Sequence, residues 1–477
     1  MDKAAIFKAH PIYIYKMLKR FVFVLILPVL KGAIQYILYR RISGVILLES
    51  IALAAIIALS VWRLLSFKVV LVSDNLIIED GVILRKRAVI PIENISSIAI
   101  TSHFVIGVFG AVNVSVNTES GIYGRKDFSF KMYKRDAAVF EAMIYGSPSQ
   151  VEIKFTPGKI ALLSATASAS LTGLIVGVPV INRIGRLLNV GVDRILSDIT
   201  ELSKSIKSYF PPIVNAITIV FIAVYGLSFL IALSRNMFFR TSTNSEKIEI
   251  KSGLYFKHKR IFKISAVKDV CIDQTPLMRA FKIFTMRVGI GGYGGENGEK
   301  STIVPAMKKR KIKEIFSPLF PVLAEKPDYV YCKKDNLTRR RFLMLPNIYV
   351  LIILGVTALL IIFLPSFERL FLFAAIVSLC FVSYYGYISL INQKICGISI
   401  GKTVVAKGVS RFTVREMYTP ADNIGLIKIM RTPVDIAKNT CRVTVQVRSE
   451  SSDSVKVRFL PYDKIKEKIN ETYGINL

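Results

Sequence analysis

Apolar and polar stretches alternate along this chain in an arrangement that occurs three times. Six apolar runs come in pairs, and a polar segment with short strand patterns follows each pair. Each run has about 20 residues, enough for a helix to cross the roughly 30 Å hydrocarbon core of a bilayer. The pattern therefore predicts three transmembrane helical hairpins that alternate with three strand-rich modules. The runs span residues 21–39 with 42–62, 160–181 with 213–234, and 342–364 with 370–391.

The strand pattern is clearest in the first polar segment, at residues 67–100. Short runs of β-branched and other apolar residues are separated there by polar turns, and Gly81 supplies the positive φ that a tight hairpin needs. The same pattern returns in the second and third polar segments, with Gly253 and Gly408 at the position of Gly81. These glycines lie about 155 to 170 residues apart, a period long enough for a whole domain in each repeat.

Each polar segment ends with a short helical pattern, at residues 134–145, 308–316 and 462–473. About seven short strands followed by one helix is the order of a pleckstrin-homology-like (PH-like) fold, a bent β-sandwich or barrel closed by its C-terminal helix. The predicted fold class is therefore a membrane α plus β protein, with three hairpins and three PH-like modules.

Two motifs in the first polar segment resemble those of a known family. The apolar-proline turn VIPIENI at residues 89–95 is followed by VFGAV at residues 108–112, which enters another strand. Together with the preceding apolar pair, they resemble the bacterial membrane-flanked PH-like domain proteins. The resemblance covers nearly the whole chain as three copies, and it weakens where FKIF (281–284) and then IAK (436–438) replace the second motif. It implies an integral membrane protein with cytoplasmic PH-like modules and no established enzyme activity.

These elements set the predicted domain boundaries. Each hairpin precedes the module to which it is attached, and a short N-terminus precedes the first hairpin. The predicted parts are a cytoplasmic N-terminus at 1–20, hairpins at 21–65, 158–236 and 342–392, and PH-like modules at 66–150, 237–325 and 393–477.

The basic residues predict which side of the membrane the modules occupy. An even number of crossings between modules places all three modules and both termini on one side. About sixteen Lys and Arg lie near the span ends that face the modules, against about eight in the opposite connections, and cytoplasmic loops carry the excess of positive charge. Arg40 and Arg41, in the first hairpin turn, oppose this locally. The modules and termini are therefore expected in the cytoplasm of a multi-pass protein of the cell membrane.

The connection at residues 182–210 is longer than the other two outer connections. Ile195, Ile199, Leu202 and Ile206 recur there at helical spacing, with charged residues on the other faces. This pattern fits an amphipathic helix in the outer membrane interface. It fits equally well a helix that packs on the ends of neighbouring spans.

Composition supports a membrane protein and argues against a nucleic-acid partner. The chain is 52% hydrophobic, yet it has 65 Lys and Arg against 33 Asp and Glu, a net charge of +32. Much of the basic charge flanks apolar spans, which favours membrane topology over nucleic-acid binding. The five cysteines show no CxxC or other metal spacing, so we expect reduced thiols with neither disulfide nor zinc site.

No motif for a reaction or a cofactor stands out. The sequence GIGGYG at 289–294 matches GxGxxG, but a hairpin signal follows it, whereas a dinucleotide site needs a helix to begin there. His10, His103 and His258 are isolated from one another and from other ligand types. We therefore expect neither an enzyme nor a metal or cofactor site.

Two charges inside the first hairpin form the most specific site hypothesis. Lys31 and Glu49 each lie about nine positions from a turn near residue 40, or roughly 13 Å below it at 1.5 Å per residue. An ionised side chain at that depth is costly and usually has a partner, so we hypothesise an ion pair. Alternatively, Lys31 extends to the interface and Glu49 is protonated.

Basic runs on the polar segments are candidate contacts with the membrane surface. Each Lys or Arg close to an anionic leaflet contributes about 1 kcal/mol, so such runs could hold the modules against lipid headgroups. A solvated loop face is the alternative. The candidate residues are Arg85, Lys86, Arg87, Lys308, Lys309, Arg310, Arg339, Arg340 and Arg341.

The expected function is binding and scaffolding at the cell envelope, with membrane lipids or proteins as partners. The family resemblance adds a smaller membrane-flanked PH-like protein as a partner, and a role in envelope stress or antimicrobial-peptide tolerance. A transporter or channel component with PH-like regulatory domains is the competing class. It requires interrupted spans with midplane polar residues, for which Pro28, Lys31 and Gly32 are the one candidate.

Overall fold

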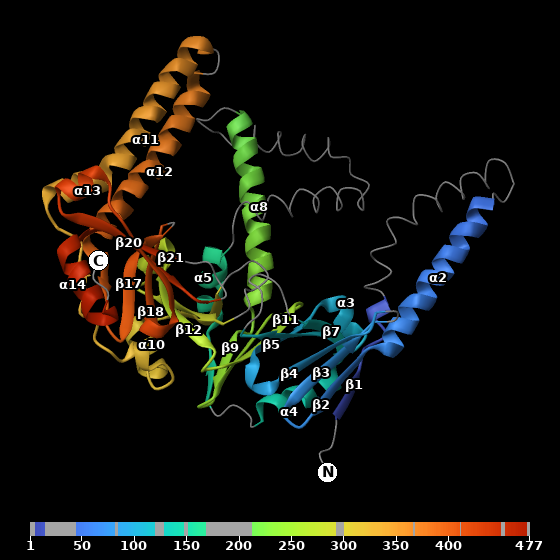
Figure 1. The fold of residues 1–477 in the computed structure, drawn as a ribbon. Coiled ribbons are helices and arrows are strands. Elements are labelled where there is room, and N and C mark those ends of the chain that lie inside the picture. The colour runs from blue at the N-terminus through green and yellow to red at the C-terminus, as the bar shows by residue number, and fades with distance from the viewer. Residues whose placement is uncertain are drawn as a thin grey trace. The chain divides into compact units, whose positions relative to one another are not determined.

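The computed structural model divides the chain into two compact units that alternate along the sequence (Figure 1). Unit 1 contains Met1–Ile153, Arg240–Ala266 and Ile290–Glu299, and unit 2 contains Lys154–Phe239, Val267–Gly289 and Lys300–Leu477. The structure describes residues 5–14, 44–81, 84–119, 128–146, 151–167, 212–291, 300–365, 368–410, 412–449 and 454–474.

Unit 1 begins with a four-stranded antiparallel sheet in the order β1-β2-β3-β4. The strand β1 near the N-terminus pairs with β2, which follows the first described helix. Gly81 comes directly after β3 with a φ of 125°, and a Cβ there would lie 2.0 Å from the Leu84 carbonyl oxygen. This confirms the predicted glycine turn. The strands are β1 (Ala5–Lys8), β2 (Lys68–Val72), β3 (Asn75–Asp80) and β4 (Lys86–Pro91).

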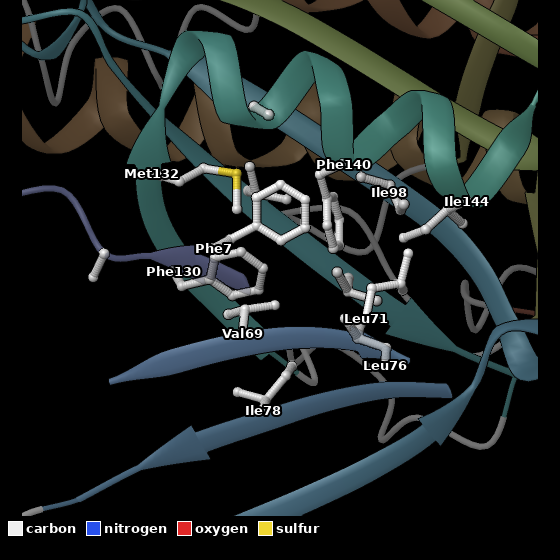
Figure 2. Packing of buried hydrophobic residues seen from close by; sticks show 14 of the residues in the cluster. Phe7, Val69, Leu71, Leu76, Ile78, Ile98, Phe130, Met132, Phe140 and Ile144 are labelled. Carbon is white, nitrogen blue, oxygen red and sulfur yellow. The ribbon is translucent and has the colours of Figure 1, made fainter. Parts of the chain in front are cut away.

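A seven-stranded antiparallel sheet completes unit 1, in the order β7-β6-β5-β11-β10-β9-β8. Helix α4 (Lys134–Tyr145) has the bounds expected from the sequence, and it buries Phe140 and Ile144. In Figure 2, these two side chains meet Phe7, Leu76, Ile98 and Phe130 from the strands, so the core lies between the helix and both sheets. The strands are β5 (Ile95–Ser102), β6 (Ala111–Thr118), β7 (Phe128–Tyr133), β8 (Val151–Lys154), β9 (Arg240–Thr243), β10 (Lys247–Ser252) and β11 (Lys257–Lys263), with helix α3 (Phe104–Val108) between β5 and β6.

Unit 2 repeats this plan with a seven-stranded sheet, β14-β13-β12-β18-β17-β16-β15, and a three-stranded sheet, β19-β20-β21. Helices α10 (Lys309–Phe316) and α14 (Tyr462–Tyr473) close the strand segments as predicted, and each buries an isoleucine one turn from its start. The strands are β12 (Val267–Gln274), β13 (Phe284–Ile290), β14 (Ser301–Met307), β15 (Val330–Tyr331), β16 (Gly397–Ser399), β17 (Thr403–Ser410), β18 (Thr413–Pro420), β19 (Ile424–Met430), β20 (Thr440–Val447) and β21 (Ser454–Pro461), with short helices α9 (Pro276–Ala280) and α13 (Pro433–Ala437).

The prediction of a glycine turn at Gly408 is wrong, although the same prediction holds at Gly253, whose φ is 104°. Gly408 lies inside β17 and pairs with Arg415. A Cβ at this position would come within 3.2 Å of the Lys456 carbonyl oxygen, so glycine is used for the close approach of β21. The chain turns later, and Phe412 there has a φ of 69°.

Long helices coincide with four of the six predicted spans. Among the described residues, α11 and α12 are long and apolar enough to cross a membrane. They pack side by side (Figure 1) and overlap the predicted spans 342–364 and 370–391. The predicted span 21–39, most of 160–181 and the connection 182–210 lie outside the described residues. The helices are α2 (Gly44–Ser66), α5 (Pro157–Ala167), α8 (Pro212–Asn236), α11 (Asn336–Phe363) and α12 (Glu368–Ile395).

The segment predicted as the second module, residues 237–325, contributes strands to both units. Its first three strands, β9 to β11, belong to the seven-stranded sheet of unit 1, and β12 to β14 belong to the seven-stranded sheet of unit 2. Between them, residues 264–266 make a short turn in which the Ala266 amide donates to the Lys263 carbonyl. Helix η1 (Ile92–Asn94) makes the corresponding connection after β4, and η4 (Ala421–Asn423) makes it after β18. Each of the three strand segments thus consists of two half-sheets joined by a short turn.

Candidate functional site: two strand joints and a basic surface

The first joint is the pairing of β5 with β11, which links the first and second strand segments inside unit 1. At its centre Ile98 lies opposite Ile261, and both side chains are fully buried. Ile98 is the fourth residue of β5, and Ile261 is the third from the end of β11. The two strands are far apart in the sequence, so no short turn fixes their alignment. Burial of this apolar pair therefore sets their register.

Lysine side chains bind the first joint to its surroundings. Lys259 of β11 forms ion pairs with Glu141 of α4 and, at 3.0 Å, with Glu249 of β10. Burial would raise the pKa of Glu249, but hydrogen bonds and charge from Lys251 and Lys259 lower it below its ordinary value. At the end of β11, the Lys263 ammonium donates to the carbonyls of Ile92 and Glu93, at 2.9 and 3.0 Å.

The second joint is the pairing of β12 with β18 inside unit 2, and it has the same register. Val270, the fourth residue of β12, lies opposite Tyr418, the third from the end of β18. Both side chains are buried, as in the first joint. The two joints therefore use equivalent strands, equivalent residues and an apolar pair at the centre.

The second joint differs in the charges that it buries. Asp273 of β12 lies opposite Arg415 of β18, whose Nε atom donates to it at 3.0 Å, and Arg287 of β13 also pairs with it. The Asp273 side chain is 2% exposed, and the two guanidinium groups supply the positive charge and hydrogen bonds that a carboxylate removed from water requires.

Glu416 forms a second charged cluster on the next residue of β18. It accepts hydrogen bonds from the hydroxyl groups of Tyr329 and Tyr418 and pairs with Lys309 of α10. Burial would raise the pKa of Glu416, but Lys309, Lys407 and Tyr418 together hold it at about 2. Glu416 is therefore ionised throughout the physiological range.

The third buried charge in unit 2 is Lys300, which pairs with Asp269 and contacts the Cys271 sulfur at 3.2 Å. Burial would lower the pKa of Lys300, but Cys271 and Asp269 raise it above its ordinary value. A fully buried ammonium with a raised pKa stays protonated and cannot serve as a base. Among the described residues, no three His, Cys, Asp or Glu side chains lie close enough together to hold a metal ion.

Comparison with known families identifies the architecture. The family model described as "Bacterial PH domain" matches residues 22–146 and 171–319, together more than half of the chain. The chain belongs to the bacterial PH domain family. No curated protein and no solved structure gave a significant match to the chain.

The bacterial PH domain matches cover most of the first two predicted modules, nearly all of the first apolar pair and part of the second, and the third module lies beyond them. In the structure, this third segment nevertheless has the same parts: a first half-sheet ending in β18, a short η4 turn, a three-stranded half-sheet and a closing helix. Its joint to the second segment also has the same register as the joint between the two matched regions. The third segment therefore has the same order of elements and the same joint register as the matched regions.

The structure separates the predicted surface basic residues of this bacterial PH protein into two groups. Lys309 and Arg341 are engaged inside unit 2: Lys309 pairs with Glu416, and Arg341 pairs with Asp435 and lies 4.2 Å above the Phe459 ring. The other seven are exposed, including two with exposed partners, Arg87 with Glu79 and Arg310 with Glu314. The exposed group is Arg85, Lys86, Arg87, Lys308, Arg310, Arg339 and Arg340.

The hypothesised pair of Lys31 and Glu49 stays a prediction. Lys31 lies outside the described residues, and Glu49 lies in α2 with its side chain outside them.

Sequence reasoning missed the acidic residues Asp273 and Glu416. The chain has half as many acidic as basic residues, and these two interrupt apolar strand patterns. A carboxylate inside a buried strand needs a cationic partner. That signal could have marked both positions as sites of tertiary pairing.

Proposed function

We propose that this protein is a non-enzymatic, multi-pass membrane scaffold whose three PH-like modules lie in the cytoplasm and hold partners at the cell envelope. The observation that carries this proposal is the helical hairpin α11–α12. Its two helices have 28 residues each, about 42 Å at 1.5 Å per residue, which exceeds the hydrocarbon thickness of a bilayer. Large apolar side chains on both helices are exposed, among them Leu351, Ile362 and Phe381. Exposed apolar side chains over the length of a bilayer-spanning hairpin are favourable in contact with lipid.

The junction between the hairpin and the third strand segment supports a scaffolding role. Helix α12 ends at Ile395 and β16 begins at Gly397, so only Cys396 separates them. The Asn392 side chain in the last turn of α12 accepts a hydrogen bond from the Val409 amide of β17 at 3.1 Å. The hairpin and the sheet are thus joined without a flexible linker, which restricts the position of the module relative to the membrane.

The other strand segments begin in a similar way. Helix α2 ends at Ser66 and β2 begins at Lys68, and Arg63 in the last turn of α2 pairs with Asp80 of β3 at 2.6 Å. Helix α8 ends three residues before β9. A membrane helix followed directly by a sheet suits a protein that presents binding surfaces at a fixed height above the bilayer.

Exposed basic residues give the proposal its lipid component. Arg339 and Arg340 lie in the first turns of α11, at the end of the hairpin next to the third strand segment. Both can reach anionic headgroups, each with a contribution of about 1 kcal/mol. We further propose a smaller membrane-flanked PH-like protein as a protein partner, with envelope stress or antimicrobial-peptide tolerance as the setting. Affinity capture followed by mass spectrometry of bound proteins and lipids identifies these partners.

Labelling of single cysteines from outside intact cells tests the membrane arrangement. The starting variant is Cys380→Ala, because Cys380 is the exposed cysteine and the other four are buried. Glu368→Cys, at the tip of the hairpin, should react with an impermeant maleimide in intact cells. Lys438→Cys, exposed on the third strand segment, should react only after the cells are permeabilised. Reaction of Lys438→Cys in intact cells would overturn the proposal.

A further inference from the structure

Comparison of the joints along the chain singles out two strands, β4 and β19, that are equivalent to joint strands but lie at the edges of their sheets. Within the described residues, β4 pairs only with β3, and β19 pairs only with β20. Strand β4 ends the first half-sheet of the first strand segment, as β11 and β18 do in the later segments. Strand β19 begins the second half-sheet of the third segment, as β5 and β12 do in the earlier ones. The two open edges are therefore of the two kinds that pair at the joints.

Both joints follow one rule. The strand that begins a second half-sheet pairs with the strand that ends the first half-sheet of the next segment, with its fourth residue opposite the third residue from the end. Applied to the open edges, this rule places Ile427, the fourth residue of β19, opposite Val89, the third residue from the end of β4. Within the described residues, β19 is not paired with β4 of its own chain, so a second copy of the chain is the source of a β4 edge that fits the rule.

We propose that β19 of one copy pairs with β4 of a second copy in an antiparallel joint, with Ile427 opposite Val89. This inference rests on the proposed scaffolding function, because it gives the scaffold its assembly. The contact is head-to-tail: each copy offers one edge of each kind, so the assembly is an open row or a closed ring. Copies that share one membrane orientation present both edges on the same side of the bilayer.

Side-chain exposure at the open edges supports the pairing. At the joint centres Ile98, Ile261, Val270 and Tyr418 are at most 1% exposed, whereas Val89 is 56% exposed. On β19, Leu426 is 50% and Met430 45% exposed. A strand edge with exposed apolar side chains and unpaired backbone groups is a template for another strand. Ile427 itself is half-buried against the core of unit 2, as Ile98 is buried in its own core, and Val89 is the uncovered member of the pair.

Charged residues and proline on β4 are compatible with this pairing, although such residues often protect an edge strand. Pro91 ends β4, and Pro420 occupies the same position in β18, which is paired. Arg87 corresponds to Lys259 of β11 and Glu416 of β18. Both of these form ion pairs with the closing helix of the preceding segment, Lys259 with α4 and Glu416 with α10. Charge at this position therefore accompanies pairing in both joints.

Cross-linking between two tagged copies tests the proposal. Both copies carry Cys380→Ala; one carries Val89→Cys and the other, with a different tag, carries Ile427→Cys. Oxidation in membranes should give a band that contains both tags, because directly opposite residues bring their Cβ atoms within disulfide range. The matched control replaces Val89→Cys with Leu84→Cys, which is 79% exposed but precedes β4, and should give little of this band.

Three results would overturn the inference: no two-tag band, equal bands from Val89→Cys and Leu84→Cys, or a cross-link from Ile427→Cys to a different protein only. A doubly substituted chain that closes on itself as a monomer would also overturn it. These outcomes are separable from failure of the proposed function, since Lys438→Cys labelling reports the membrane side independently.

Self-association measured without cross-linking gives a second readout. Leu426→Lys should weaken association of the protein in detergent by about tenfold or more, because the substitution puts a charge next to Ile427, opposite the apolar Ile90 of β4 in the proposed register. Leu84→Lys is the control and should leave association unchanged. Circular dichroism should show that both variants are folded, since both side chains are exposed. Equal association of the two variants would contradict the proposal.

Discussion

The joint in unit 1 and the joint in unit 2 have the same register but different chemistry. The β5–β11 joint has an isoleucine pair at its centre, and its lysines find partners on α4, on β10 and on the η1 turn. The β12–β18 joint keeps the apolar centre and adds the buried carboxylates of Asp273 and Glu416. Backbone pairing and one apolar contact are therefore sufficient for the register, whereas the charges make each joint different from the other.

This difference has a consequence for specificity. A half-sheet with a buried carboxylate can pair only with a half-sheet that supplies cations at matching positions, since an unpaired buried charge is strongly unfavourable. Strand β18 carries Arg415 and Glu416, which match Asp273 and Lys309 of the second segment. The corresponding partners in the first segment are Thr101 and α4, whose Glu141 would repel Glu416. The charges thus disfavour pairing of β18 with β5 in the place of β11.

Removal of Asp273 should have the largest effect on this comparison. Asp273→Ala leaves Arg415 and Arg287 without their carboxylate in a buried position, which should lower the free energy of unfolding by about 3 to 5 kcal/mol. Thermal unfolding of the protein in detergent, followed by circular dichroism, measures the loss. Glu314→Ala, which breaks an exposed pair with Arg310, is the control and should cost less than about 1 kcal/mol. Equal losses in both variants would show that the buried charge is not important.

Truncation of Ile261 tests the feature that both joints share. Ile261→Ala empties a fully buried position in the first joint and should cost about 2 to 5 kcal/mol. Val89→Ala changes the equivalent residue on β4, which is exposed, and should stay within about 0.5 kcal/mol when the protein is dilute. The same unfolding measurement applies to both. A large loss from Val89→Ala in dilute protein would show that β4 is already covered within one chain.

Acid should weaken the second joint through Glu416. Its pKa is held at about 2 in the folded protein, below the ordinary 4.5, so the folded state is stabilised when Glu416 is ionised. This stabilisation, about 3 kcal/mol, is complete above pH 4.5 and is lost as the pH falls toward 2. Urea unfolding across this range should show the loss, and Glu416→Gln should lack this part of the pH dependence. Parallel pH curves for the two proteins would contradict the assignment.

Local patterns in the sequence predicted the elements well, and tertiary pairing accounts for what they missed. The closing helices coincide with α4 and α14, and Gly81 has the positive φ expected of it. Lys259, in a stretch of basic residues at 257–260, lies in β11, a central strand of a seven-stranded sheet. Its partner Glu141 is 118 positions away, and no local pattern indicates a contact at that separation.

The site shows the same limit. Arg339 and Arg340 are exposed, as expected from their place beside an apolar span, but Arg341 is taken up by Asp435, 94 positions away. Three consecutive arginines have the same local chemistry, and only the packing of α11 against the third strand segment distinguishes them. The division of the second strand segment between two sheets escaped prediction for the same physical reason, because strand partners are chosen by the folded chain.

The alternation of the two units along the sequence also governs the order in which the protein can fold during synthesis. Strand β5 leaves the ribosome early, but its partner β11 is made about 160 residues later, after two further apolar runs. For that interval the nascent chain carries a β5 edge that β11 does not yet cover. A translation pause or a chaperone that acts before residue 257 is synthesised would therefore determine whether β5 pairs with β11 or with a strand of another protein.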